Sequence, residues 1–302
     1  MSRPIEIVEV GPRDGLQSEP DVLPTAAKLE LIRRLVDAGV RRVEVASFVH
    51  PKRVPQMADA EAVLAELPRR PDVQYVGLVL NRRGFDRALA AGCTEIGMVA
   101  VATDSFGESN QGASIEGTIR GWEEIAPLAH AAGIRAQVTI SVAFGCPFEG
   151  EVPARRVADI ARRLAASAPF EIAIADTIGV AVPSQVTALV EQVKAAIGGI
   201  PLRCHFHNTR NTAVANAYAA VLAGVDTLDA SVGGIGGCPF APNATGNVAT
   251  EDLVYMLSRA GFQTGIDLDR LIETARWLQD LRGRPVPGMV AKAGGFPRIP
   301  AA

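Results

Sequence analysis

Short runs of β-branched and other apolar residues recur along the chain, and each is followed by a turn and then by a longer amphipathic stretch. This alternation is typical of a parallel sheet in which a helix connects each strand to the next. Eight strands are predicted, at residues 5–10, 42–46, 73–79, 95–100, 135–143, 171–176, 202–207 and 226–232. Helices are predicted at about 25–38, 55–67, 82–91, 114–132, 153–167, 183–197, 211–223 and 249–260.

Eight strand–helix units fit a closed (β/α)8 barrel, or TIM barrel, better than an open doubly wound sheet, which usually has fewer strands. Glycines follow four of the predicted helices, where a left-handed residue commonly closes a helix: Gly39, Gly92, Gly133 and Gly224. We therefore predict an α/β fold with one catalytic TIM-barrel domain over residues 1–302. The barrel occupies about 4–262, and a short helical extension occupies about 263–302, where "LDRLIETARWLQDLRG" predicts a further helix.

Composition narrows the functional classes. With 48% hydrophobic and 21% charged residues among 302, the chain can bury a large core. A net charge of −3 gives no basic surface for nucleic acid. The absence of a long apolar run and of a signal-peptide pattern predicts a cytoplasmic protein without a membrane partner. The four cysteines are far apart and suggest neither a disulfide framework nor a zinc knuckle: Cys93, Cys146, Cys204 and Cys238.

Catalytic groups of such barrels lie at the C-terminal ends of the strands and in the loops that follow them. Polar residues gather at these positions here, and the candidates are Arg13, Asp14, Glu44, Asp176, His205, His207, Cys238 and Asn247. Small-molecule chemistry at the mouth of the barrel is therefore the first hypothesis.

The most specific candidates are His205 and His207, in "CHFH". Residues i and i+2 of a strand point to the same face, so both imidazoles would project together. Two imidazoles and one carboxylate, completed by water or substrate, would suit Mg²⁺ or Mn²⁺. The alternative is that both histidines only form hydrogen bonds inside the barrel.

Arg13 and Asp14 lie in "GPRDG", which contains two turn dipeptides. The segment is either a turn with a local ion pair, or a place where Asp14 binds a cation and Arg13 meets developing negative charge. Asn247 has a similar ambiguity, because it could cap a helix or offer its carbonyl oxygen to a hard metal.

Three further residues are open to two interpretations each. Glu44 and Asp176 end apolar strands, where an unpaired charge is costly, so each requires a partner such as Arg13 or a metal-bound histidine. Cys238 lies in a glycine-rich loop, "GGIGGCPF". It is either a small buried hydrophobic residue or a thiol that transfers a proton while the loop excludes water.

Taken together, these segments resemble the 3-hydroxy-3-methylglutaryl-coenzyme A (HMG-CoA) lyase family. The resemblance extends in order over about residues 5–260 and rests on "VEVGPRDGLQ" (8–17), "SFVHPKRVPQMADAEAVL" (47–64), "GCPFEG" (145–150), "DTIGV" (176–180), "CHFH" (204–207) and "GGIGGCPFAPNATGNVATEDLVYML" (233–257). The family belongs to the metal-dependent (β/α)8 lyases and condensing enzymes.

The resemblance implies a divalent-metal-dependent lyase that cleaves HMG-CoA to acetyl-CoA and acetoacetate by a retro-Claisen reaction, as in leucine degradation and ketone-body metabolism. The implied ligands of the cation, Mg²⁺ or Mn²⁺, are Asp14, His205, His207 and Asn247. Arg13 would stabilise the enolate. We also expect a homo-oligomer, either a dimer or a tetramer.

For the remaining candidates the resemblance implies supporting roles. Cys238 would transfer a proton, while Glu44 and Asp176 would orient Arg13 and the groups around the metal. Asn110 and Ser114, in "NQGASIE", match a region that contacts coenzyme A in the family.

The chain departs from the family at Asn208-Thr209-Arg210-Asn211, where an acidic residue and Thr-Tyr-Gly are common. We hypothesise that this segment alters either the tuning of the histidines or the recognition of substrate. A lyase of the same mechanism acting on a related 3-hydroxyacyl-CoA is therefore an alternative. Less favoured are a condensing acyltransferase of the isopropylmalate or homocitrate synthase type and a non-catalytic barrel.

Overall fold

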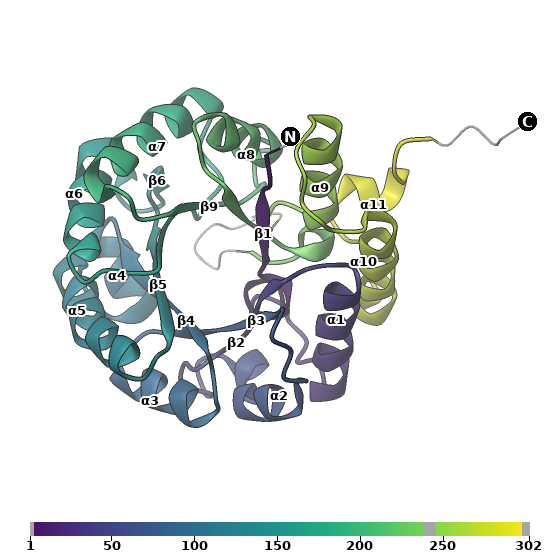
Figure 1. Ribbon diagram of the computed structural model, residues 1–302, viewed down its shortest axis with the longest axis horizontal. Coiled ribbons are helices and arrows are strands. Elements are labelled where there is room, and N and C mark those ends of the chain that lie inside the picture. Colours follow the sequence, from purple (N-terminus) through teal and green to yellow (C-terminus); the bar gives the residue numbers. More distant parts are fainter. Residues whose placement is uncertain (1–2, 238–245, 298–302) are drawn as a thin grey trace, which may run out of the picture.

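The computed structural model describes residues 3–237 and 246–297 of the chain, and its centre is a closed barrel of parallel strands (Figure 1). The strands neighbour one another in the order β1-β10-β9-β8-β5-β4-β3-β2. Their bounds are β1 (Glu6–Glu9), β2 (Arg42–Ser47), β3 (Gln74–Val79), β4 (Glu95–Val101), β5 (Arg135–Ser141), β8 (Glu171–Asp176), β9 (Leu202–Phe206) and β10 (Thr227–Ala230). Each predicted strand corresponds to one of these, so the predicted TIM barrel is confirmed.

Helices surround the barrel and cover its outer face (Figure 1). They are α1 (Thr25–Asp37), α2 (Ala60–Glu66), α3 (Arg82–Ala90), α5 (Ile115–Ala131), α6 (Ala154–Ala165), α7 (Pro183–Ile197), α8 (Ala213–Leu222) and α9 (Thr250–Arg259). The four glycines predicted to close helices all have positive φ, from 69° at Gly133 to 106° at Gly39. Apolar periodicity and helix-closing glycines thus predicted this outer layer correctly.

Several short elements were not predicted as such from the sequence. They are the π-helical turn η1 (Gly11–Gly15), the 3-10 turn η2 (Pro55–Met57), which was predicted as the first turn of a helix at 55–67, the 3-10 turn η3 (Val232–Gly234), the hairpin β6 (Gly145–Cys146) and β7 (Gly150–Glu151), and the helices α4 (Asp104–Gln111) and α11 (Met289–Ala293). All are too short to show a clear apolar period. Most of them lie in the loops after strands, where they shape the mouth of the barrel.

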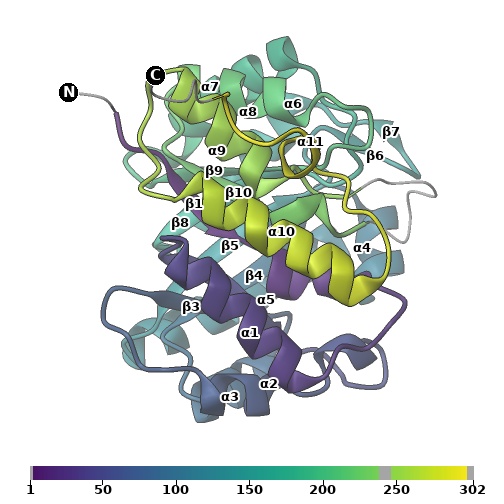
Figure 2. The same cartoon turned by 90° about the vertical axis from the view of Figure 1, so that its right-hand side faces the viewer.

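The C-terminal extension contains the predicted helix, α10 (Leu268–Arg282), which lies along α1 (Figure 2). The guanidinium of Arg34 in α1 lies 4.9 Å from the ring centroid of Trp277 in α10. Arg282 also donates two hydrogen bonds to Glu19, at 2.8 and 2.9 Å, so the extension is tied to the loop after β1. Within the described ranges, no helix has the length and apolar character needed to cross a membrane.

The N-terminal end of the barrel interior is filled by charged side chains rather than by an apolar plug. Arg42 is fully buried and lies 3.2 Å from Glu6, 2.5 Å from Glu95 and 3.0 Å from Glu171. We call Arg42, Glu95 and Glu171 the lower layer. Opposite charges in direct contact offset the cost of removing these groups from water.

Candidate active site

The C-terminal end of the barrel opens into a cavity of about 840 Å³. Arg13, Asp14, Glu44, His205 and His207 all line this cavity. The structure therefore brings these five predicted residues together at the end of the barrel where the sequence placed them.

Arg13 and Asp14 are presented by the π-helical turn η1. The carbonyl oxygen of Val10 accepts backbone hydrogen bonds from Arg13, Asp14 and Gly15, at 3.2, 2.7 and 3.2 Å. A Cβ atom at Gly15 would lie 2.7 Å from the side chain of Ile235, which only glycine avoids. Such single turns of π-helix are frequent at functional sites, and this one places Arg13 and Asp14 at the cavity.

The guanidinium of Arg13 is fixed by two carboxylates. Its Nη1 lies 2.7 Å from Asp14 Oδ1, and its Nη2 lies 2.6 Å from Glu44 Oε2. Arg13, one of the two kinds of partner predicted for Glu44, is therefore the observed one. A β-bulge between Glu44 and Ala46 breaks the register with β3, and bulges commonly re-aim side chains next to active sites. Burial raises the pKa of Glu44 more strongly than the charge of Arg13 lowers it.

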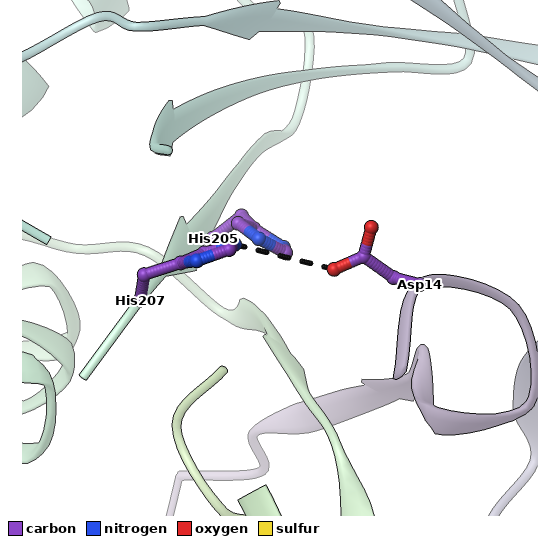
Figure 3. A group of neighbouring side chains, drawn as sticks. All are labelled: Asp14, His205 and His207. Carbon is purple, nitrogen blue, oxygen red and sulfur yellow. Dashed lines mark ion pairs between the residues drawn. The ribbon is translucent and has the colours of Figure 1, made fainter. Parts of the chain in front are cut away.

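His205 and His207 lie on one face of the chain, and both rings point toward the carboxylate of Asp14 (Figure 3). The ligand atoms of these three residues all lie within 4.8 Å of one another. His207 Nε2 is 4.0 Å from Asp14 Oδ2. The predicted shared face of the two histidines is therefore confirmed, together with a carboxylate that completes the cluster.

The ionisation of these groups suits a cation. Burial alone would raise the pKa of Asp14, but Arg13 and the two histidines lower it to about 2, so the carboxylate is charged at neutral pH. Burial and the neighbouring His205 lower the pKa of His207 to about 4, so its imidazole is neutral. A charged carboxylate and a neutral imidazole are the forms that bind metals.

Asn247 lies beside this cluster and does not cap a helix. Its Nδ2 donates to Asp14 Oδ2 at 2.8 Å and to the carbonyl oxygen of Ile235 at 3.1 Å. Its Oδ1, like His207 Nδ1, is buried without a hydrogen-bond partner in the described part of the chain. Unsatisfied buried polar atoms are costly. An amide oxygen, a carboxylate and imidazole nitrogens are ligands that suit Mg²⁺ or Mn²⁺, so these residues fit such a cation.

Two residues of the cavity wall were missed from the sequence, namely Asp229 in β10 and Arg203 in β9. Asp229 Oδ2 lies 3.0 Å from His205 Nδ1, and Asp229 Oδ1 lies 2.5 Å from Arg203 Nη1. Burial would lower the pKa of His205, but its contact with Asp229 raises it. Charged residues inside otherwise apolar strands were the available signal, because such residues require partners in the barrel interior.

Asp176 has other hydrogen-bond partners than the predicted ones. Its carboxylate accepts backbone N–H bonds from Val180 at 2.9 Å and from Ala181 at 3.0 Å. Its hydrogen-bond donors are therefore backbone groups and not Arg13 or a histidine. Burial raises the pKa of Asp176, and the charge of His205 counteracts this shift, so His205 acts on Asp176 through charge alone. The loop after β8 folds back over the strand end and supplies backbone donors, which a pattern of residue types does not reveal.

The two candidates for coenzyme A contacts differ in position. Asn110, near the end of α4, lines the cavity. Ser114 is not among the lining residues, and its hydroxyl instead accepts the N–H of Gly117 at 3.2 Å as the N-cap of α5. Cys238 lies outside the described residues, whereas the preceding Gly237 lines the cavity.

The unusual segment after His207 holds loops together. Asn208 Oδ1 accepts the N–H of Ala213 at 3.1 Å, next to the start of α8. Arg210 Nη1 donates to the carbonyl oxygens of Ile178 and Gly179, at 3.1 and 2.9 Å. These contacts join the loop after β9 to the loop after β8, and the hypothesised effect on substrate choice stays a prediction.

Comparison with known proteins gives full-length relatives. The (R)-citramalyl-CoA lyase of Chloroflexus aurantiacus is 43% identical, over 98% of this chain and 96% of that protein. The mitochondrial hydroxymethylglutaryl-CoA lyase of Bos taurus is 41% identical, over 96% of this chain and 89% of that protein. Both relatives cleave acyl-CoA compounds according to their names.

Comparison with solved structures gives proteins of the same kind as comparison of sequences. An HMG-CoA lyase from Acenitobacter baumannii, in complex with coenzyme A and 3-methylmalate, superimposes with a TM-score of 0.93. It is 39% identical, and the match covers 98% of both chains. The model of the HMGL-like family matches residues 4–278. The chain therefore belongs to the HMGL-like family and is an enzyme of the hydroxymethylglutaryl-CoA lyase type.

Proposed function

We propose that the protein is a divalent-cation-dependent carbon–carbon lyase that cleaves HMG-CoA to acetyl-CoA and acetoacetate. The observation that carries this proposal is the convergence of Asp14, His205 and His207 beside Arg13 in one cavity at the barrel mouth. The full-length similarity to the lyase of Bos taurus supports the same reaction.

The cation, Mg²⁺ or Mn²⁺, would be held by Asp14, His205 and His207, with the carbonyl oxygen of Asn247 as a further ligand. When bound, it polarises the substrate hydroxyl and lowers the pKa of that hydroxyl. The neutral imidazole of His207 and the charged Asp14 are ready to bind it without first losing a proton.

Arg13 supplies positive charge where negative charge develops. In a retro-Claisen cleavage, the hydroxyl loses its proton, the bond between C2 and C3 breaks, and its electron pair becomes the enolate of the acetyl thioester. A guanidinium fixed by Glu44 can donate hydrogen bonds to that enolate oxygen without reorganisation. C2 of the enolate then takes up a proton, and we propose Cys238, which follows the cavity-lining Gly237, as the group that transfers it.

An acyl-CoA is the proposed substrate class. Arginine, histidine and amide side chains also line the cavity: His50, Arg53, Asn81, Arg82 and Asn110. Such groups suit the phosphates and the polar pantetheine of coenzyme A. The related structure from Acenitobacter baumannii, which contains coenzyme A, supports this choice.

A second candidate substrate is (R)-citramalyl-CoA, because the lyase of Chloroflexus aurantiacus is 43% identical to this chain. Citramalyl-CoA carries its carboxylate directly on the hydroxyl-bearing carbon, one methylene closer than in HMG-CoA. The same bond cleavage would then release acetyl-CoA and pyruvate. The two functions share a mechanism and differ in the second product.

The deciding experiment incubates the purified protein and Mg²⁺ or Mn²⁺ with each thioester and identifies the second product by mass spectrometry. Acetoacetate from HMG-CoA supports the proposed function, and pyruvate from citramalyl-CoA alone supports the second candidate. Failure to release acetyl-CoA from either compound would contradict both. A His207→Ala variant, prepared in parallel, controls for contaminating lyases.

We further propose one catalytic domain over residues 1–302, a homo-oligomer, and a place in the cytoplasm. The packing of α10 against α1 and the bonds from Arg282 to Glu19 support the single domain. Light scattering after size-exclusion chromatography would test the assembly, with a dimer or tetramer expected and a monomer contradicting it.

A further inference from the structure

Two buried residues outside the predicted ligand set lie behind one of the histidines. We propose that Arg203 and Asp229 are positioning residues that hold His205 with its Nε2 toward the cation. This inference rests on the cation site of the proposed function. It concerns how the chain prepares that site before any metal binds.

The geometry assigns a fixed orientation to His205. Asp229 Oδ2 lies 3.0 Å from His205 Nδ1, and an ionised carboxylate can only accept hydrogen bonds. Nδ1 therefore carries the hydrogen, and Nε2 keeps its lone pair for a metal. Carboxylates behind metal-binding histidines fix ring orientation and tautomer in many metal sites.

Asp229 is itself held by Arg203. Its second oxygen, Oδ1, lies 2.5 Å from Arg203 Nη1, so both carboxylate oxygens are in use. Each of these two residues is 4% exposed. Because the planar guanidinium donates along fixed directions, it sets the plane of the carboxylate as well as its charge.

Arg203 is anchored by neighbouring strands. Its Nε lies 2.8 Å from Glu171 in β8, and its Nη2 donates to Gln137 and, at 3.3 Å, to Thr139 in β5. The side chain therefore has little freedom to turn away from Asp229. A positioning residue must be rigid in this way, because a loose support would not fix the imidazole.

The charges of the interior favour a cation at this end. One ion-paired group contains three arginines and four carboxylates, so its net charge is +3 − 4 = −1: Arg42, Arg135, Arg203, Glu6, Glu95, Glu171 and Asp229. Asp229 contacts one guanidinium, that of Arg203, and its other oxygen faces the imidazole of His205. Asp229 therefore places a carboxylate directly behind His205 and the cation site.

His207 offers an internal contrast. Its Nδ1 is buried and has no hydrogen-bond partner in the described part of the chain. The two histidines are thus unequal: His205 is oriented before metal binding, whereas the tautomer of His207 is not fixed by a protein partner.

The test measures Mn²⁺ binding to the full-length protein by calorimetry, without substrate. We expect Arg203→Met and Asp229→Asn to weaken binding by about 10- to 100-fold, as changes behind metal ligands commonly do. Arg42→Met is the matched control. It removes the other buried guanidinium that contacts Glu171 but leaves the bonds to Asp229 in place, so its affinity should stay within about threefold of wild type.

The possible outcomes separate the two proposals. No Mn²⁺ binding by the wild type would overturn the cation site and the positioning role together. Binding by the wild type with equal affinity in Arg203→Met and Asp229→Asn would overturn the positioning role alone. If Arg203→Met does not fold, Arg203→Lys replaces it. That variant keeps the charge but loses the planar fork, so unchanged affinity in Arg203→Lys and Asp229→Asn would overturn the inference.

A spectroscopic readout distinguishes positioning from general support of the fold. An asparagine at 229 has one acceptor for two donors, so its NH₂ group would face either Arg203 or His205 Nδ1. If the NH₂ group faces His205 Nδ1, that nitrogen must accept the hydrogen bond, and the ring hydrogen moves to Nε2. In this tautomer Nε2 cannot bind the cation. Long-range ¹H–¹⁵N correlation spectra of the metal-free protein should show Nδ1–H for His205 in the wild type and in Arg42→Met, and Nε2–H in Asp229→Asn. The same tautomer in all three would contradict the inference.

Discussion

Charged side chains occupy both ends of the barrel interior, but their surroundings differ. In the lower layer, Arg42, Glu95 and Glu171 each have an opposite charge within 3.2 Å. At the mouth, His207 Nδ1 and Asn247 Oδ1 are buried without partners among the described residues. Glu95 Oε2 also lacks a hydrogen bond, but it faces the guanidinium of Arg135 at 3.2 Å, whereas the two atoms at the mouth face no opposite charge in the described ranges.

Buried charge alone therefore does not identify a functional site. Buried ion pairs also serve the fold, provided that their bonds are satisfied. Buried donors and acceptors without any partner, beside the neutral imidazole of His207 and the ionised carboxylate of Asp14, are the more specific signal. The following predictions test whether the two ends can be disturbed separately.

The largest effect is expected at the mouth. His207→Ala removes one proposed ligand of the cation, and we expect kcat/KM to fall by at least about 1,000-fold, because loss of the cation removes several kcal/mol of charge stabilisation. Thermal unfolding should change little, since the ring makes no hydrogen bond through Nδ1. Steady-state kinetics and calorimetry on one preparation check both statements. A variant that retains half of wild-type activity would remove His207 from the mechanism.

Arg42→Met is expected to show the opposite pattern. It leaves Glu95 and Glu171 buried with one cation fewer each, so the free energy of unfolding should fall by about 3–5 kcal/mol. The folded fraction should keep its kcat and KM within about twofold. Urea denaturation and kinetics well below the melting temperature test this. If Arg42→Met lost activity as well as stability, the lower layer would not be separable from the active site at the mouth.

Glu251, in α9, is a buried carboxyl group that belongs neither to the lower layer nor to the predicted metal ligands. Burial raises its pKa to about 8, and its Oε2 accepts the N–H of Gly233 at 2.9 Å. Because the folded-state pKa exceeds the unfolded value, the folded state holds the extra proton. Stability is therefore full below about pH 4.5 and is lost as pH rises to about 8.

Glu251→Gln cannot ionise and should flatten this pH dependence. We expect the wild type to lose roughly 2–4 kcal/mol more than the variant between about pH 5 and pH 9. Urea denaturation in EDTA at several pH values measures the difference. Parallel curves for the two proteins would show that Glu251 is not protonated in the folded state.

The smallest effect is expected at Arg210. Its Nη1 is engaged by two carbonyl oxygens, so Arg210→Ala should cost about 1 kcal/mol of stability and leave the preference between HMG-CoA and citramalyl-CoA unchanged. The matched control is Arg53→Ala at the cavity wall, for which KM should rise by about 3- to 10-fold for both thioesters. A tenfold change in preference in Arg210→Ala would instead support the effect on recognition hypothesised from the sequence.

The sequence predicted those parts of the site that single positions determine. Strand periodicity placed His205 and His207 on one face, and the barrel rule placed Asp14 and Glu44 at the same end. Asp229 was missed because its importance depends on β9 and β10 being neighbours. Their register places Leu228, the residue before Asp229, opposite Cys204, the residue before His205. The backbone donors of Asp176 were missed because a pattern of side chains does not show them.

Metal removal tests most directly whether the mouth of the barrel needs a cation. Acetyl-CoA release from HMG-CoA and from citramalyl-CoA should be measured after EDTA treatment and again after stepwise addition of Mn²⁺, with bound metal determined in parallel. We expect activity on the substrate thioester to fall below about 1% without metal and to return as about one Mn²⁺ binds per chain. Full activity in a metal-free sample would contradict this expectation.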